Sequence, residues 1–80
     1  MIMDSQRIQI DSDYIKLDSL LKLAGLVMSG GEAKLVIQDG LVKVNGDVEI
    51  RRGRKLYPGD CVELEGAPAV ILMSQQAGRS

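Results

Sequence analysis

At Gly40 the spacing of apolar residues changes from a helical period to an alternating one, and this change determines the fold class that the sequence predicts. Before Gly40, apolar residues recur at intervals of three and four, as on the buried face of a helix. After it, Val42 and Val44 alternate with polar residues, as in a half-buried strand. A chain of 80 residues has room for one small core. We therefore predict a single α+β domain: two short helices packed on a small antiparallel sheet with a β-hairpin.

Two helices are expected on the amino-terminal side of Gly40. The first has an apolar stripe that runs from Leu17 to Ala24, and it is ended by Gly25, a residue suited to the left-handed end of a helix. The second begins at Ser29, which forms the capping-box pattern with Glu32 three residues later. Neither helix is long enough to be stable alone, so both must pack their apolar stripes on each other or on a sheet.

A hairpin is expected where Asn45 and Gly46 separate two alternating apolar runs. A two-residue turn would place Asp47 and Glu49 opposite the valines of the first strand, on the apolar face. A three-residue connection, or a bulge after the turn, would pair these valines with Val48 and Ile50 instead. Because a shift of one residue turns every side chain to the other face, we predict the longer turn or the bulge.

The remaining pattern predicts short strands and turns. Pro58 and Gly59 fit the central positions of a type II turn. Strands are expected at residues 61–64 and 69–72, and a further short strand is possible at residues 8–10. We expect one domain over residues 1–80, with a core at residues 14–73 and flexible tails at residues 1–7 and 74–80.

Composition excludes several classes of site. The chain has no histidine and one cysteine, Cys61, so an intrachain disulfide, a conventional zinc site and the usual general base near neutral pH are all missing. Cys61 lies in an alternating pattern and is expected to be a core or half-buried residue. No apolar run approaches the roughly 20 residues that cross a bilayer, and the first residues lack the layout of a secretory signal. We therefore expect a cytoplasmic, non-catalytic protein with no metal, cofactor or membrane contact.

The positive charges are concentrated in the middle of the chain. The net charge of −1 is unusual for a nucleic-acid-binding protein. Residues 16–55, however, contain eight of the ten Lys and Arg residues and five of the eleven acidic ones. Four of these cations lie in residues 51–55, where arginines could bind phosphate oxygens or stack on an unpaired base. We favour RNA contact there over the alternative of a solvated loop that aids solubility.

These elements occur in the order helix, helix, hairpin, Pro-Gly-Asp turn and strand. The characteristic residues are Lys16, Leu17 and Asp18, then Ser29 with residues 32–34, then residues 40–46 and 58–60. Over about 45 of the 80 residues, this arrangement resembles the ribosomal-protein-S4-type RNA-binding domain, also called the αL fold. The paired glycines at residues 30 and 31 and the basic run at residues 51–56 look most like its small stand-alone YaaA/YbcJ-like branch.

The resemblance implies binding to structured RNA, either ribosomal or tRNA-like, with ribosomal particles as possible partners and a monomer as the expected state. We expect a basic groove in the service of ribosome assembly or maturation. Its candidate residues are Lys16, Ser29, Gly30, Gly31, Lys34, Lys43, Asn45, Arg51, Arg52, Arg54 and Lys55. Many members of the family carry an arginine directly after the serine that begins the second helix, and this chain has glycines there.

Alternatives remain at two levels. At the start of the second helix, Ser29 and Glu32 could merely cap the helix, or the N–H groups exposed by the two glycines could bind a phosphate. For the whole protein, the alternative function is a protein-interaction adaptor that docks through the hairpin or the acidic flanks. A sulfur-carrier protein is disfavoured, because the chain ends in Gly78-Arg79-Ser80 and not in the exposed Gly-Gly of a carrier.

Overall fold

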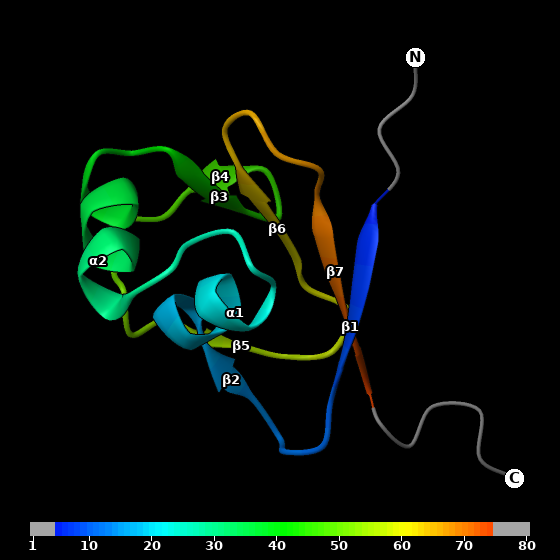
Figure 1. Ribbon diagram of the computed structural model, residues 1–80. Coiled ribbons are helices and arrows are strands. Elements are labelled where there is room, and N and C mark those ends of the chain that lie inside the picture. The colour runs from blue at the N-terminus through cyan, green and yellow to red at the C-terminus, as the bar shows by residue number, and fades with distance from the viewer. Residues whose placement is uncertain (1–4, 75–80) are drawn as a thin grey trace, which may run out of the picture.

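In the computed structural model, which describes residues 5–74, two helices pack on one face of a five-stranded sheet (Figure 1). The elements are β1 (Gln6–Ile10), β2 (Ile15–Lys16), α1 (Leu17–Leu23), α2 (Gly30–Gln38), β3 (Val42–Val44), β4 (Asp47–Val48), β5 (Lys55–Leu56), β6 (Cys61–Leu64) and β7 (Val70–Ser74). The strand order of the large sheet is β1-β7-β6-β3-β4, and β2 and β5 form a separate two-stranded ribbon. The predicted α+β fold is confirmed.

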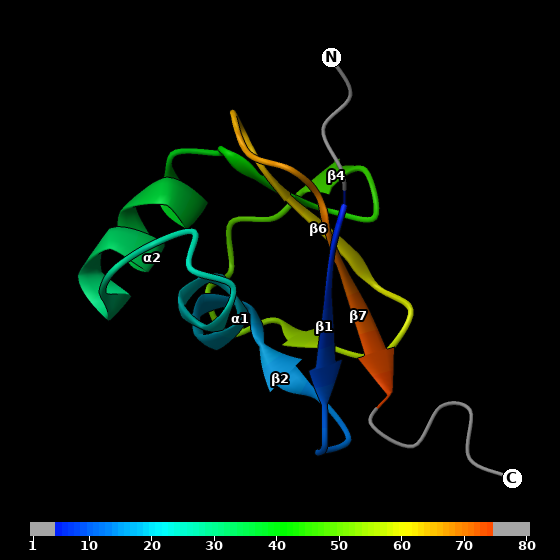
Figure 2. The same cartoon turned by 45° about the vertical axis from the view of Figure 1, so that its right-hand side comes forward.

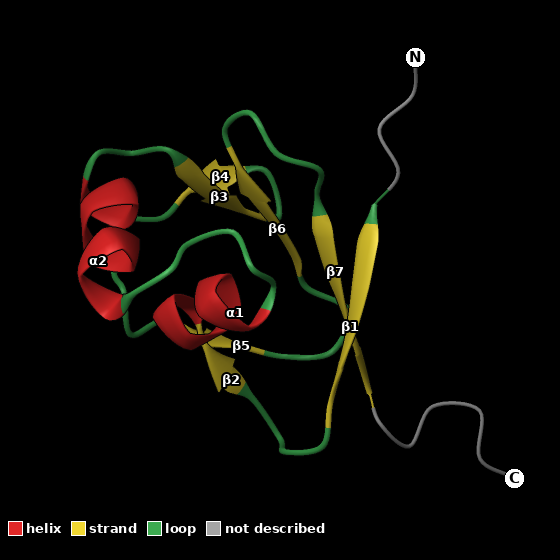
Figure 3. Cartoon of the chain, in the orientation of Figure 1, coloured by secondary structure: helices red, strands yellow, loops and turns green. Residues whose placement is uncertain are grey.

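The large sheet is mixed, where the sequence predicted an antiparallel one. Strands β7, β6, β3 and β4 pair antiparallel, but β1 runs parallel to β7 along one edge (Figure 3). A parallel pair needs a long connection, and here nearly the whole domain lies between the two strands. The flexible tails predicted at residues 1–7 and 74–80 therefore extend too far into the domain, since Gln6, Arg7 and Ser74 lie in strands. Residues 1–4 and 75–80 of those tails lie outside the described residues.

Both helices begin and end where the sequence predicts. Helix α1 is followed by Gly25 with a φ of +76°, and α2 by Gly40 with a φ of +78°. At the start of α2, the backbone N–H of Glu32 donates to Ser29 Oγ over 3.1 Å. The Glu32 carboxylate accepts from the N–H of Met28 over 2.8 Å, one residue before the position of the usual capping box. Of the first N–H groups of α2, that of Glu32 therefore finds its acceptor within the chain.

The core between the helices and the sheet is entirely aliphatic. Its fully buried side chains include leucines of α1, Ile37 of α2 and the inward-facing valines of the sheet. Burial of each such side chain stabilises the folded state by roughly 1.5 to 3 kcal/mol. Cys61, at the start of β6, is half-buried, in agreement with its predicted place. Neither described helix is long and apolar enough to cross a membrane.

The hairpin has a two-residue turn, so the predicted longer connection is wrong. Val44 pairs with Asp47, and both turn residues have a positive φ, +53° at Asn45 and +90° at Gly46, as in a type I′ turn. In this register Glu49 points inward and is only 6% exposed, whereas the neighbouring Val48 is 55% exposed. The sequence argued against this register because it places two acids, Asp47 and Glu49, on the apolar face; Asp47 is exposed, so only Glu49 needs compensation.

Two arginines from the following loop remove that objection. Arg51 Nε lies 2.9 Å from one carboxylate oxygen of Glu49, and Arg54 Nη1 lies 2.8 Å from the other. The backbone N–H of Arg51 also donates to the carboxylate over 3.0 Å. The hydrogen bond from Arg51 outweighs the opposing effect of burial and, with the bond from Arg54, lowers the pKa of Glu49 to about 2. A buried carboxylate is tolerated when it is paired and hydrogen-bonded in this way.

The hairpin turn is joined to the Pro-Gly turn by side-chain hydrogen bonds. Asn45 Nδ2 donates to an Asp60 carboxylate oxygen over 3.1 Å, and Asn45 Oδ1 accepts from the N–H of Cys61 over 2.9 Å. The second Asp60 oxygen accepts from the N–H of Tyr57 over 2.8 Å. The N–H of Asp60 donates to the Tyr57 carbonyl, and Gly59 has a φ of +98°, as the predicted type II turn requires. Asn45 therefore has a structural role in the fold.

We expect the Glu49 ion pairs to make stability depend on pH in the acid range. The pKa of Glu49 is about 2 in the folded protein and about 4.5 when unpaired. Its contribution is therefore complete above pH 4.5 and is lost as the pH falls toward 2. Urea unfolding should give a difference of about 1 to 3 kcal/mol between wild type and Glu49→Gln at pH 7. The difference should vanish near pH 2, and a constant difference across this range would contradict the assignment.

Substitutions at Asn45 separate its hydrogen bonds from its backbone conformation. Asn45→Gly keeps the positive φ but removes both side-chain bonds, and should lower the free energy of unfolding by about 1 to 2 kcal/mol. Asn45→Ala should cost about 1 kcal/mol more, because alanine is strained at that φ. Urea denaturation of the two variants measures both quantities. Equal stabilities of Asn45→Gly and wild type would show that the bonds between the turns contribute nothing.

Candidate nucleic-acid interface

The basic loop, residues 51–55, is held against the start of α1 by backbone hydrogen bonds. The N–H of Leu17 donates to the Arg54 carbonyl over 2.9 Å, and that of Asp18 to the Arg52 carbonyl over 3.1 Å. The first N–H groups of a helix have no partner within the helix, so this loop satisfies two of them. The loop is thereby brought beside Lys16, the residue that precedes α1.

Three cations of this region form the surface that we call the basic patch: Lys16, Arg52 and Lys55. In the ribbon, Lys16 lies directly opposite Lys55, while Ile15 and Leu56 pair on the inner side. All three cations are exposed. Like charges placed opposite each other on paired strands repel, so this arrangement does not favour the fold. Both ion pairs found among residues 5–74 belong to Glu49, and neither includes a residue of the basic patch.

The other two cations of the basic loop have a structural role. Arg51 and Arg54 share the carboxylate of Glu49, which raises the pKa of Arg51 above its ordinary value. Two positive charges and one negative charge leave a net charge of one on this triad. The loop is therefore less positive than its sequence suggests, and its conformation depends on the same two arginines.

The predicted residues at the start of α2 lie apart from the basic patch. Figure 2 shows α1 between α2 and the β2–β5 ribbon. Ser29, Gly30, Gly31 and Lys34 are all exposed. Neither glycine has a positive φ, and a Cβ at Gly30 would meet no atom within 4 Å. Backbone conformation and packing therefore do not require glycine here, and the capping role of Ser29 and Glu32 is the one that the structure shows.

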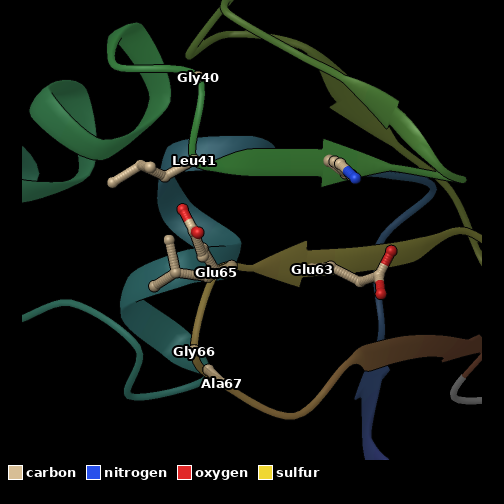
Figure 4. A pocket seen from close by; sticks show the side chains of 8 residues that line it. Gly40, Leu41, Glu63, Glu65, Gly66 and Ala67 are labelled. Carbon is tan, nitrogen blue, oxygen red and sulfur yellow. The ribbon is translucent and has the colours of Figure 1, made fainter.

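Lys43 lies elsewhere again, on the outer face of the sheet. It pairs across the strands with Glu63 and borders a hollow of about 320 Å³ (Figure 4). The hollow is lined by Gly40, Leu41, Lys43, Glu63, Leu64, Glu65, Gly66 and Ala67. Two carboxylates against one ammonium group make it unsuited to a phosphate. Among residues 5–74, no group of three or more histidine, cysteine or acidic side chains is placed to hold a metal ion.

The structure thus divides the candidate residues that the sequence placed along one groove. Lys16 joins the basic loop, whereas Asn45, Lys43 and the start of α2 do not. The β2–β5 ribbon that makes this junction was not predicted. A signal for it exists, because residues 14–16 read Tyr-Ile-Lys and residues 55–57 read Lys-Leu-Tyr. Such mirrored patterns are what two paired antiparallel strands with a common inner face require.

Comparison with known proteins agrees with this fold. The model of the S4 domain family matches residues 8–72. The chain is 51% identical over 59 residues to "Probable ribosome maturation protein RlbA" of Bacillus subtilis (strain 168), covering 74% of this chain and 83% of the relative. It is 43% identical over 53 residues to YbcJ of Escherichia coli (strain K12), covering 66% and 76% of the two chains.

A solved structure has a similar fold. It is the solution structure of YbcJ from E. coli, described as revealing an αL motif involved in RNA binding. It matches with a TM-score of 0.63 and 33% identity, covering 91% of this chain and 90% of the other. Sequence, family model and fold therefore agree, and this chain belongs to the S4 domain family.

Proposed function

We propose that this chain binds structured RNA through the basic patch without catalysing a reaction, and that its target is ribosomal RNA during ribosome assembly or maturation. The family, the αL motif of YbcJ and the naming of RlbA as a probable ribosome maturation protein support this proposal. We further propose that it acts as a monomer in the cytoplasm, where ribosomal particles would be its partners.

The observation that carries the proposal is the opposed pair Lys16 and Lys55 beside Arg52. Cations held close together without acidic partners repel each other, and a phosphate backbone placed between them removes that repulsion. Release of counterions from the RNA adds a further favourable contribution. The patch is also rigid, because backbone hydrogen bonds to α1 and β2 hold it. A rigid cationic surface suits helical RNA, which proteins recognise largely by shape and phosphate position.

One observation favours the second candidate, a protein-interaction adaptor. Val48 is 55% exposed and Ile50 62% exposed, close together in sequence at the outer edge of the hairpin. An edge strand with exposed apolar side chains can bind a partner protein. Co-purification of a protein that survives nuclease treatment, together with no measurable affinity for RNA, would favour the adaptor.

The first prediction for RNA binding concerns the three residues of the basic patch. The triple variant Lys16→Gln, Arg52→Gln, Lys55→Gln should bind a structured ribosomal RNA fragment about tenfold or more weakly. The slope of log K against log salt should fall by about 2 to 3, at roughly 0.7 to 0.9 for each phosphate that the variant no longer neutralises. Fluorescence anisotropy at several salt concentrations measures both effects.

A matched control removes the same charge from other surfaces. Arg7, Lys22 and Lys43 are exposed cations outside the patch, and the triple variant Arg7→Gln, Lys22→Gln, Lys43→Gln should keep affinity within about twofold. An equal reduction of affinity in both variants would reject the patch in favour of binding by overall charge. Arg51 and Arg54 stay unchanged in this design, because their removal would leave the carboxylate of Glu49 buried and unpaired.

The start of α2 is tested by a gain of function. Gly30 has open space around it and a φ that is not positive, so Gly30→Arg should fold normally. If the bound RNA extends across α1 to this corner, the added guanidinium should strengthen binding several-fold and steepen the salt dependence by about one neutralised phosphate. Gly30→Gln is the control, because glutamine also has a long side chain and a similar helix propensity but carries no charge. Equal affinities of the two variants would place the start of α2 outside the interface.

A further inference from the structure

The two tyrosines of the chain, Tyr14 and Tyr57, lie side by side at the outer side of the β2–β5 ribbon. Their ring centroids are 6.1 Å apart and the ring planes are inclined by 51°. Tyr14 directly precedes Ile15 of β2, and Tyr57 directly follows Leu56 of β5, the residue that pairs with Ile15. The ammonium group of Lys55 lies over the Tyr14 ring, 4.9 Å from its centroid.

These rings contribute little to the core. They are the only aromatic side chains of the chain, and the buried core consists of aliphatic residues. Tyr14 is 38% exposed and Tyr57 is 49% exposed. Aromatic side chains provide more apolar area for burial than most others, so leaving both at the surface gives up stability that the core could have gained.

The backbone around both tyrosines is held in place. The carbonyl of Tyr14 accepts a hydrogen bond from Ser12 Oγ over 2.7 Å. The N–H of Tyr57 donates to the Asp60 carboxylate, which is itself bonded to Asn45. Lys55 supports the Tyr14 ring through a cation–π contact. A pair of exposed rings on a fixed backbone loses little conformational entropy when a ligand stacks on it.

We propose that Tyr14 and Tyr57 form a stacking platform for one unpaired nucleobase of the bound RNA, in which one ring stacks on the face of the base and the inclined second ring packs against its edge, while the flanking phosphates lie on Lys16 and Lys55. Phenol rings stack on the face of any base, and cations beside them bind the backbone on either side. In a continuous double helix each base face is covered by its neighbours. The target is therefore RNA with a bulged or otherwise unstacked nucleotide within or next to a helix. This inference rests on the proposed RNA binding and narrows its ligand.

Two probe RNAs test the platform: a fully paired hairpin, and the same hairpin with one unpaired adenosine in its stem. Wild type should bind the bulged hairpin about tenfold more tightly, a preference within the range of stacking on one aromatic side chain. Tyr57→Leu should abolish this preference and keep the affinity for the paired hairpin within about twofold. Tyr57→Phe keeps the ring and should keep the preference.

Tyrosine emission gives a second readout, because the chain contains no tryptophan or phenylalanine. Corrected for absorption by the RNA, it should be quenched more by the bulged hairpin than by the paired one. Thermal unfolding of each variant shows whether it is folded, and Tyr14→Leu serves in place of Tyr57→Leu if the latter unfolds.

Three outcomes would overturn the platform. The first is equal affinity of wild type for both hairpins, and the second is an unchanged preference in the leucine variant. In both cases, binding of the paired hairpin that depends on the basic patch would leave the proposed function intact. The third is no binding of either hairpin or of the ribosomal RNA fragment, which would reject the proposed function and the platform together.

Discussion

The carboxylate of Glu49 between Arg51 and Arg54 is the interaction on which the arrangement of the surface depends. It permits the tight hairpin turn, because that register points an acid inward. It then directs the chain after β4 back toward α1, where carbonyls of the same loop accept from the N–H groups of Leu17 and Asp18. From there the chain enters β5 and pairs with β2. The ion triad around the buried carboxylate of Glu49 thus positions the elements that carry the basic patch and the two tyrosines.

The basic loop shows that charge density in a sequence is not the same as charge available for binding. Its four cations look equivalent in the sequence, but Arg51 and Arg54 pair with Glu49, whereas Arg52 and Lys55 are exposed and form no ion pair within residues 5–74. The exposed pair is joined by a third cation, Lys16, from a position 36 residues before Arg52. A small domain can therefore present a cationic surface at a net charge of −1, because some of its acids lie on other surfaces, as Glu63 and Glu65 do around the hollow.

Local signals predicted the two helices and most strands of the large sheet, and long-range pairing determined what they missed. The helix boundaries follow from residues close in sequence, such as Ser29 with Glu32 and the left-handed glycines at residues 25 and 40. The hairpin register depended on whether Glu49 could be compensated, and its partners come from a loop whose course the pattern does not reveal. The parallel pairing of β1 with β7 joins the two ends of the domain. The site could not be predicted for the same reason, since Lys16 and Lys55 come together only because β2 pairs with β5.

That ribbon connects stability with the proposed function. Two strands of two residues each are too short to be stable alone, and the opposed lysines weaken them further. Their pairing is maintained by Ile15 and Leu56 on the inner side and by the contact of Lys55 with the Tyr14 ring on the outer side. In the proposed complex, a phosphate between the lysines and a base on the tyrosines would replace repulsion by attraction. Because such a ligand binds only the folded ribbon, RNA binding and folding would stabilise each other by mass action.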